Sequence, residues 1–312
     1  MRNCNTPYDD VFRTLLIDCK NLIIPVVNEI FKEDYTGNEK IVLKENEIFL
    51  RQQHGEEEKR ITDSSFDIVS IGEEHARQYH IECQSTSDGS MLIRMYEYDS
   101  QMALKNGEVE NGILNVHFPD SAIVYLRKSK NILSNMKICI HTSGGSVDYK
   151  IPVLNVTDYD IKTIFKKKLL FLLPFHIFTY EENLEEFEKS EEKRQKLREI
   201  YSNIVKRLEK LCMSGEIDEY TRLTICEMTE KVVKHLANGQ KKVQKEVVEI
   251  MGGKVLDHTA KRIYQHGKIE EAQENALEFF KNGASFEMVE KSIKTLTHDE
   301  LVEIYNRAGM SE

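Results

Sequence analysis

The sequence predicts an α/β (α+β) fold followed by a helical C-terminal region. Residues 7–34 carry apolar side chains near helical period, whereas residues 41–156 contain short extended runs separated by polar turns. From residue 181 the chain is strongly charged in both signs, and Glu and Lys or Arg recur at the i,i+4 spacing of a solvent-lined helix. We therefore expect an α/β domain over residues 1–180 and a charged helical region over residues 181–312.

Local signals place the elements of the first domain. Pro25 interrupts the first helical segment, which predicts one kinked helix or two. A helix is expected from Ser87 or Asp88, one of which would cap it, to about Leu104. The turn that starts at Gly72 joins two extended runs into an antiparallel hairpin. Strands are expected at residues 41–50, 61–71, 78–86, 121–127, 136–142 and 147–156, the last two joined by Ser143-Gly144-Gly145-Ser146.

Composition narrows the class of protein. The chain has 312 residues, of which 40% are hydrophobic and 31% charged, so it is long enough to bury a core without covalent links. Its 6 cysteines show no C-x-x-C spacing and its first residues lack a secretory apolar stretch, from which we expect a reducing, cytoplasmic location. The longest apolar run, Leu169 to Phe178, is shorter than the roughly 20 residues of a membrane span, so we expect no membrane insertion.

Net charge constrains any contact with nucleic acid. At −10, the charge has the wrong sign for binding DNA by bulk electrostatics. A DNA contact would need a local basic surface, and lysines gather between Arg127 and Lys168 among few acids. A solvated protein face explains these lysines equally well.

Common nucleotide and zinc motifs are missing from the sequence. There is no G-x-G-x-x-G, and the segment Met251-Gly252-Gly253-Lys254 lacks the upstream strand of a phosphate-binding loop. His75 and His80 have no cysteine partners at zinc-ligand spacing, so we expect both to be surface residues.

Acidic and amide residues instead occupy strand positions of the hairpin. Glu82 and Gln84 are two residues apart and project from one face of their strand, and Asp63 and Asp67 share a face of the preceding strand. If the hairpin turns near Glu74, Asp67 lies opposite Glu82 and Asp63 lies a few residues further along.

Converging carboxylates favour a hard divalent cation. Close carboxylates repel each other and are costly to desolvate unless a cation lies between them. Mg²⁺ prefers oxygen ligands and keeps several waters, so two carboxylates plus the backbone carbonyl of Cys83 would leave positions for a phosphate oxygen and a water. The alternative is a sheet with one solvated polar face.

These residues resemble a known family, the PD-(D/E)xK nuclease superfamily. The similarity is to its Rpn-like branch of recombination-promoting nucleases, also described as transposase-like. It covers most of the chain and is most specific over residues 8–105. The matching segments are Tyr8 to Arg13, Arg60 to Phe66, Tyr79 to Ser85, the positions Arg94, Glu97, Tyr98 and Gln101, Leu277 to Ser285, and Leu296 to Leu301.

The resemblance implies a restriction-endonuclease-like core, in which helices flank a mixed central sheet that carries the metal site on its hairpin. It implies that Asp63 and Glu82 are the two acids that bind Mg²⁺ or Mn²⁺, with Asp67 as the alternative first acid. Gln84 stands where the superfamily usually has lysine, a change that matches this branch but removes a positive charge.

The implied activity is metal-dependent hydrolysis of DNA phosphodiester bonds in recombination or mobile-element biology. Asp9, Arg94, Glu97 and Gln101 are the candidate supporting residues. The competing hypothesis is a catalytically weak nuclease fold that serves as a DNA- or protein-binding module. The C-terminal helices are expected to position DNA, form a homodimer or bind a partner.

Overall fold

The protein is described by a computed structural model that divides into two compact units. The first comprises Met1–Ile217 and Thr224–Gly253, and the second comprises Asp218–Leu223 and Lys254–Glu312. The units do not divide at residue 180, beyond which the sequence becomes strongly charged. The structure describes residues 6–44, 47–51, 57–61, 64–70, 76–85, 89–128, 135–252, 272–293, 296 and 298–308.

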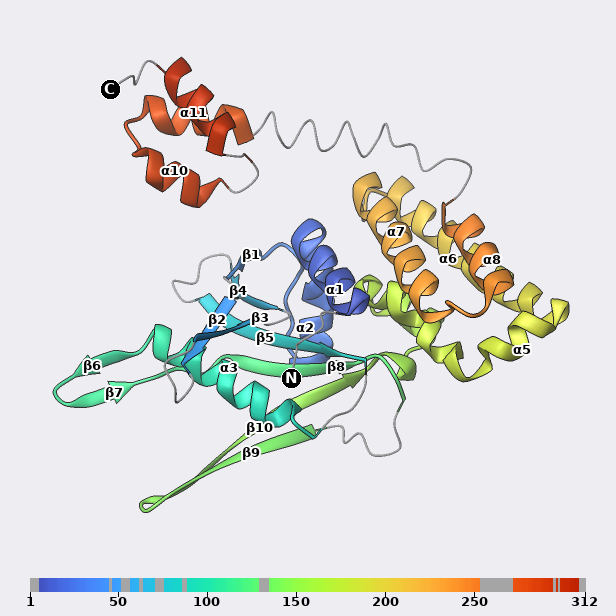
Figure 1. Cartoon of the computed structure of the whole chain (residues 1–312), viewed down its shortest axis with the longest axis horizontal. Helices are drawn as coiled ribbons and strands as arrows, with labels where there is room; N and C mark the ends of the chain where they lie inside the picture. Colours follow the sequence, from blue (N-terminus) through green and yellow to red (C-terminus); the bar gives the residue numbers. More distant parts are fainter. Residues whose placement is uncertain are drawn as a thin grey trace. The chain divides into compact units, whose positions relative to one another are not determined.

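A six-stranded mixed sheet lies at the centre of the first unit (Figure 1). Its strand order is β1-β4-β5-β8-β10-β9, with β5 and β8 parallel and β4 and β5 antiparallel. Two short hairpins, β2–β3 and β6–β7, stand apart from this sheet. The strands are β1 Lys40–Leu43, β2 Glu47–Arg51, β3 Glu57–Ile61, β4 Ser65–Val69, β5 Ala76–Gln84, β6 Glu108–Glu110, β7 Ile113–Asn115, β8 Asp120–Tyr125, β9 Asn135–Thr142 and β10 Gly145–Asn155.

One face of the sheet is covered by the N-terminal helices α1 (Pro7–Asp18) and α2 (Ile24–Phe31) (Figure 1). Helix α1 begins at a capping box, in which Thr6 and the third helical residue, Asp9, bond to each other's backbone N–H. A 3₁₀ turn at Lys20–Ile23 separates the two helices, so the predicted kinked segment is two helices and Pro25 lies in the first turn of the second.

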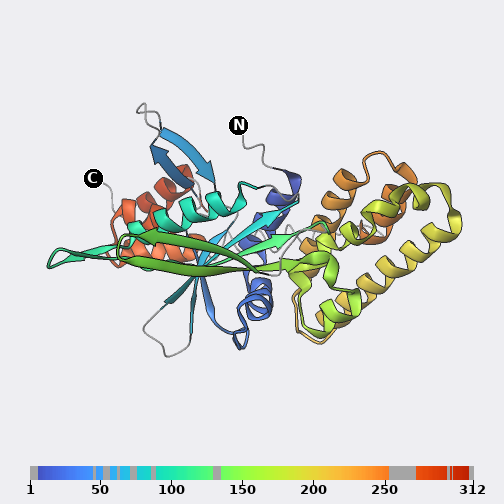
Figure 2. The same ribbon diagram turned by 90° about the horizontal axis from the view of Figure 1, so that it is seen from below.

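Helix α3 (Met91–Lys105) covers the opposite face, where it runs along the sheet in Figure 2. Its buried Met91 and Met95 pack with Ile123 of β8 and Ile151 of β10. The predicted cap was wrong in detail, because the residue before the helix is Ser90 and its side chain makes no capping hydrogen bond. Ser87 and Asp88 lie outside the described residues.

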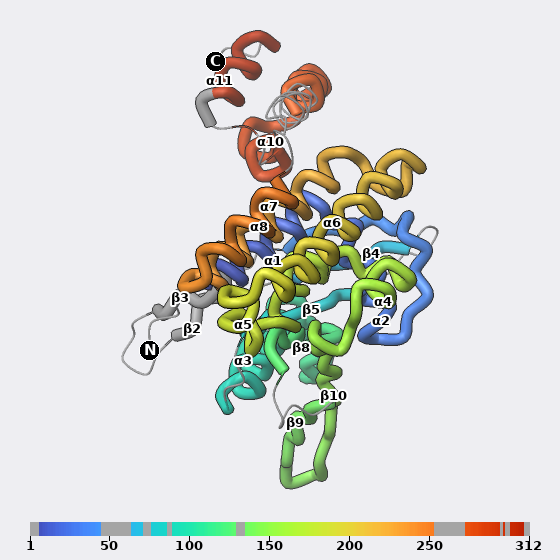
Figure 3. Tube along the Cα trace, turned by 90° about the vertical axis from the view of Figure 1, so that its right-hand side faces the viewer, coloured from blue at the N-terminus to red at the C-terminus, as the bar shows by residue number. Residues whose placement is uncertain are grey.

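Helices complete the first unit beside the sheet (Figure 3). An apolar 3₁₀ segment packs on α1 through the rings of Phe171 and Phe12, whose centroids are 4.9 Å apart. Charged side chains join neighbouring helices, since Arg194 and Arg198 of α6 both bind Glu246 of α8. The elements are η2 Val156–Asp158, α4 Ile161–Lys166, η3 Leu170–Asn183, α5 Leu184–Lys189, α6 Glu191–Met213, α7 Glu219–Leu236 and α8 Lys241–Gly252.

The second unit has a small apolar core of its own. Phe280 is fully buried; it stacks on Phe286 of α10 (Phe286–Ser292) and makes an edge-to-face contact with Tyr305 of α11 (His298–Arg307). Among all the residues that the structure describes, no helix is long and apolar enough to span a membrane.

Candidate functional site

Strand β5 carries the polar residues that the sequence singled out. Because side chains alternate along a strand, His80, Glu82 and Gln84 face α3 while Ile81 and Cys83 face α1 and α2. The strand lies inside the sheet between β4 and β8, so Glu82 is only 3% exposed. Gln84, the last residue of the strand, is half-buried. Sequence reasoning therefore predicted the shared face of Glu82 and Gln84.

His80 is the residue that sequence reasoning misjudged. It is completely buried rather than at the surface, whereas His75 lies outside the described residues. Its Nε2 lies 3.0 Å from Oε1 of Glu82, and its Nδ1 lies 2.6 Å from Oδ1 of Asp99 on α3. The imidazole ring therefore joins a carboxylate of the sheet to a carboxylate of the covering helix.

Asp99 is held by three neighbours at once. Besides His80, the Ser121 hydroxyl donates to Oδ1 at 2.8 Å and the Tyr149 hydroxyl donates to Oδ2 at 3.1 Å. Ser121 lies on β8 directly beside His80, and Tyr149 lies on β10. The cluster of Glu82, His80, Asp99, Ser121 and Tyr149 thus links three strands to α3, and we call it the His80 network.

The His80 network favours a doubly protonated imidazole. Burial by itself lowers the pKa of His80, but the hydrogen bonds and charges of Asp99 and Glu82 outweigh it and raise the pKa to about 10. Both ring nitrogens then donate, one to each carboxylate. The hydroxyl of Tyr149 also stays protonated, since burial and the charge of Asp99 raise its pKa.

Asp9 of α1 is an acid whose pKa is affected by the charge of Glu82. Burial is the main cause that raises the pKa of Asp9, and the negative charge of Glu82 raises it further. Its hydrogen bonds with Thr6 and the charge of Arg13 act in the opposite direction. Asp9 caps α1, so the structure gives it a folding role whether or not it takes part in chemistry.

The expected place of Asp67 was wrong. Asp67 pairs with Gln78, not with Glu82, in the same register that pairs Val69 with Ala76. It lies on the same face as Glu82 but four residues away along the strand, about 13 Å, and its carboxylate binds Lys44 at 2.6 Å. Asp63, the first-ranked acid, lies outside the described residues, and Ser64, which follows it in the chain, donates its hydroxyl to the carbonyl of Ile81.

The expected polar stripe on α3 is present but uneven. Arg94 and Glu97 are half-buried, whereas Gln101 is exposed to solvent. Asp99 of α3, which the stripe did not include, reaches the β5 cluster by a hydrogen bond to His80. No short-range pattern marks Asp99, since its partners are 19, 22 and 50 residues away in sequence.

The backbone beside Glu82 has a defined direction. The carbonyl of Gln84 accepts from Leu126 on the β8 side, and the N–H of Ile81 donates to Ser64 on the β4 side. Because backbone groups alternate sides along a strand, the carbonyl of Cys83 is directed toward the β4 side. Among the described residues no three His, Cys, Asp or Glu side chains form a metal-binding group.

Four basic residues of the surface expected between Arg127 and Lys168 form ion pairs with acids. Arg127 binds Glu181, while Lys137 binds Asp148. Two further lysines make ion pairs of the same kind, Lys167 with Glu29 and Lys168 with Glu216. Lys130 lies outside the described residues.

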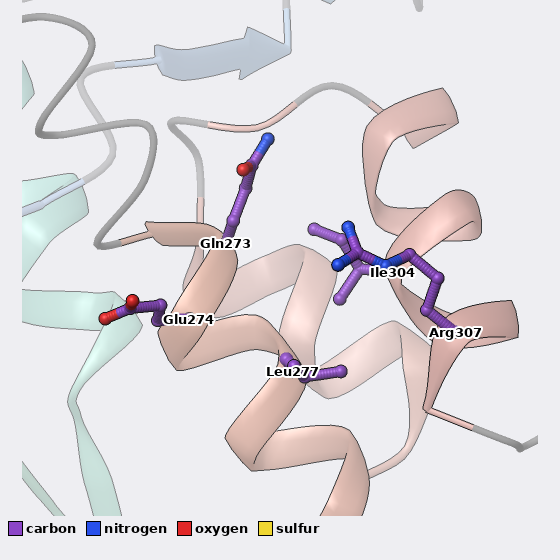
Figure 4. Close-up of a pocket in the computed structure, with 5 residues that line it drawn as sticks. All are labelled: Gln273, Glu274, Leu277, Ile304 and Arg307. Carbon is purple, nitrogen blue, oxygen red and sulfur yellow. The ribbon is translucent and has the colours of Figure 1, made fainter.

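The second unit contains a pocket of about 390 Å³ (Figure 4). Arg307 and Ile304 of α11 face the helical segment at residues 272–281, whose Glu274 carboxylate points away from Arg307. Five of the described residues line the pocket, and only one of them is an acid: Gln273, Glu274, Leu277, Ile304 and Arg307.

Comparisons with known proteins assign no function to either unit. The His80 network is therefore interpreted from its own geometry, and the nuclease resemblance from the motif residues of this sequence. No family model, no curated protein and no solved structure matches this chain.

Proposed function

We propose that the protein is a metal-dependent DNA endonuclease with a restriction-endonuclease-like core, and that Glu82 is one of its metal ligands. The observation that carries the proposal is a buried glutamate held by a network of its own on a central strand. Glutamates are almost never fully buried unless they are paired, and Glu82 is buried in contact with His80.

The order of the elements supports this core. A capped helix α1 is followed by the antiparallel pair β4–β5, then by α3, and then by β8 parallel to β5. The α3 crossover connects the two parallel strands, while α1 and α2 cover the other face. This order of elements is compatible with the core that the resemblance implies, and Glu82 and Gln84 of the motif lie on β5.

The residues around Glu82 suit a hard cation. Burial is the main cause that raises the pKa of Asp9, and the nearby charge of Glu82 raises it further. A cation between two such carboxylates would offset their repulsion. Carboxylate oxygens and the Cys83 carbonyl are the ligand types that Mg²⁺ and Mn²⁺ accept. When bound, such an ion lowers the pKa of a water and offsets the charge of the phosphate. Asp63 is proposed as the other acidic ligand.

We assign a role in this reaction to Glu82, Gln84 and Arg94. Glu82 holds the cation, while Gln84 at the end of β5 positions the water or a phosphate oxygen by its amide. Gln84 supplies no charge, so we expect slower cleavage than a lysine at this position would give. Arg94 on α3 is proposed to contact a phosphate.

The test is cleavage of supercoiled plasmid by the purified full chain with Mg²⁺ or Mn²⁺. We expect nicking that EDTA abolishes and that Glu82→Ala and Asp63→Ala each remove while both variants keep the wild-type circular dichroism spectrum. Equal nicking by the wild type and both variants, or nicking that survives EDTA, would contradict the proposal.

A protein-binding module is the second candidate, because apolar side chains are exposed on the β6–β7 hairpin. Val109 is 74% exposed and Ile113 62%. In this alternative the nuclease fold is inert and the hairpin contacts a partner. A wild-type chain that binds no divalent ion and nicks no DNA would favour this alternative.

A further inference from the structure

We infer that His80 is a positioning residue, which fixes the orientation of the Glu82 carboxylate for metal binding through a hydrogen bond from Nε2. The inference rests on the proposed function and deepens it, since it assigns a role to a residue outside the nuclease motif. The geometry of the His80 network carries it.

The imidazole of His80 is fixed on every polar atom. Nδ1 is 2.6 Å from Asp99 and Nε2 is 3.0 Å from Glu82, so neither nitrogen is left for solvent. The ring also contacts the edge of Tyr98, with the ring centroids 5.9 Å apart. With a relative exposure of 0%, His80 has no room to change rotamer without breaking these contacts.

Asp99 is in turn fixed by groups on other elements. Ser121 on β8 and Tyr149 on β10 donate to different oxygens of Asp99, so its carboxylate plane is set by the sheet. If the Glu82 carboxylate rotates, it therefore loses the hydrogen bond between Oε1 and Nε2 of His80, because the His80 ring cannot move with it. Residues that hold a ligand in this way commonly change metal affinity by 10- to 100-fold when they are lost.

Two substitutions separate positioning from mere burial. In His80→Gln the side-chain amide reaches about as far as Nε2 and still donates to Glu82, whereas in His80→Asn it reaches only about as far as Nδ1. Both variants lose the imidazole and its charge, so a difference between them reports the hydrogen bond to Glu82. Thr229→Val is the control, because Thr229 is 1% exposed on α7 and its hydroxyl bonds to the carbonyl of Ile225.

The experiment is a titration of the metal-free full chain with Mn²⁺, followed by electron paramagnetic resonance, beside a thermal unfolding curve for each variant. We expect the Kd of His80→Asn for Mn²⁺ to exceed that of His80→Gln by about tenfold. Thr229→Val should lower Tm and leave the Kd at the wild-type value. Equal Kd values for the two His80 variants would overturn the inference. So would a Thr229→Val variant whose Kd for Mn²⁺ rises as its Tm falls.

A second variant keeps the test open if the His80 variants do not fold. Ser121→Ala combined with Tyr149→Phe removes both hydroxyl donors to Asp99 and changes no charge. We expect weaker Mn²⁺ binding in the folded double variant, and an unchanged Kd would contradict the inference. A wild-type chain that binds no Mn²⁺, or a Glu82→Ala chain that binds as the wild type does, would overturn the proposed metal site itself.

Discussion

Gln84 is the residue whose chemistry can be changed with the least disturbance. It is half-buried at the end of β5. A lysine stabilises developing phosphate charge more strongly than an amide does, by roughly 1–3 kcal/mol. We therefore expect Gln84→Lys to raise the single-turnover cleavage rate about tenfold or more. Identical rates for the wild type, Gln84→Lys and Gln84→Ala would show that this position does not face the phosphate.

Asp67 supplies the matched negative control at the residue scale. Its ion pair with Lys44 is partly exposed, and Glu82 lies four residues further along. We expect Asp67→Ala to cost less than about 1 kcal/mol of unfolding free energy and to leave Mn²⁺ affinity and cleavage unchanged. A loss of cleavage comparable to that of Glu82→Ala, measured at equal Tm, would return Asp67 to the site.

Single residues also show where prediction from sequence ended. The strand period placed Glu82 and Gln84 on one face because that period depends only on neighbouring residues. The burial of His80 depends on Asp99, Ser121 and Tyr149, which approach it only after α3 and β10 pack on the sheet. The place of Asp67 was wrong because pairing depends on the register of the hairpin, and the observed pairing of Val69 with Ala76 moves the partner of Asp67 from Glu82 to Gln78.

At the scale of elements, η3 contains a second buried histidine of opposite character. His176 is 2% exposed, its Nδ1 has no hydrogen-bond partner among the described residues, and the ring of Tyr180 lies 5.5 Å away. Burial lowers the pKa of His176 to about 4, against which the charge of Asp160 acts only weakly. The folded state therefore holds this imidazole neutral.

The sign of the resulting pH dependence follows from proton binding. Between a pKa of about 4 in the folded state and about 6.5 in the unfolded state, the unfolded chain binds more protons. We expect the unfolding free energy to fall as pH falls from about 6.5 to 4, with a contribution from His176 on the order of 2–3 kcal/mol. Urea unfolding at several pH values measures this dependence. The unfolding free energy of His176→Phe should fall less with decreasing pH than that of the wild type, whereas His141→Gln, at an exposed site, should follow the wild type.

Elements were predicted best where the pattern was local. The β9–β10 hairpin forms at the predicted Ser-Gly turn. The strands expected at residues 41–50 and 61–71 were wrong in extent, because the first is divided between β1 and β2 and the second between β3 and β4. The β6–β7 hairpin was not predicted, although Asn111-Gly112 is a typical two-residue hairpin turn and both residues have positive φ. The cap of α3 was misplaced because several capping residues stand in a row before it.

At the scale of the whole molecule, the second unit is expected to be dispensable for folding of the first. Its core of Phe280, Leu301 and Ile304 consists of its own residues. We therefore expect a chain of residues 1–253 to keep a cooperative unfolding transition and the Mn²⁺ affinity of the full chain. Calorimetry of both chains checks this, and a shortened chain without a cooperative transition would contradict it.

The helical C-terminal region remains the predicted interface of a homodimer. In the second unit Phe279 is 47% and Met288 62% exposed, which leaves apolar surface for a second copy. Light scattering on the full chain is expected to give about twice its mass of 36.4 kDa. The chain of residues 1–253 is expected to give less than twice its own mass. A monomeric full chain at micromolar concentration would contradict the prediction.

The central claim is that Glu82 holds a divalent cation, and anomalous diffraction from a crystal soaked in Mn²⁺ tests it most directly. We expect a peak about 2.0–2.3 Å from a carboxylate oxygen of Glu82, with Nε2 of His80 still bonded to Oε1. No peak at Glu82, in crystals where Mn²⁺ binds elsewhere on the chain, would contradict it.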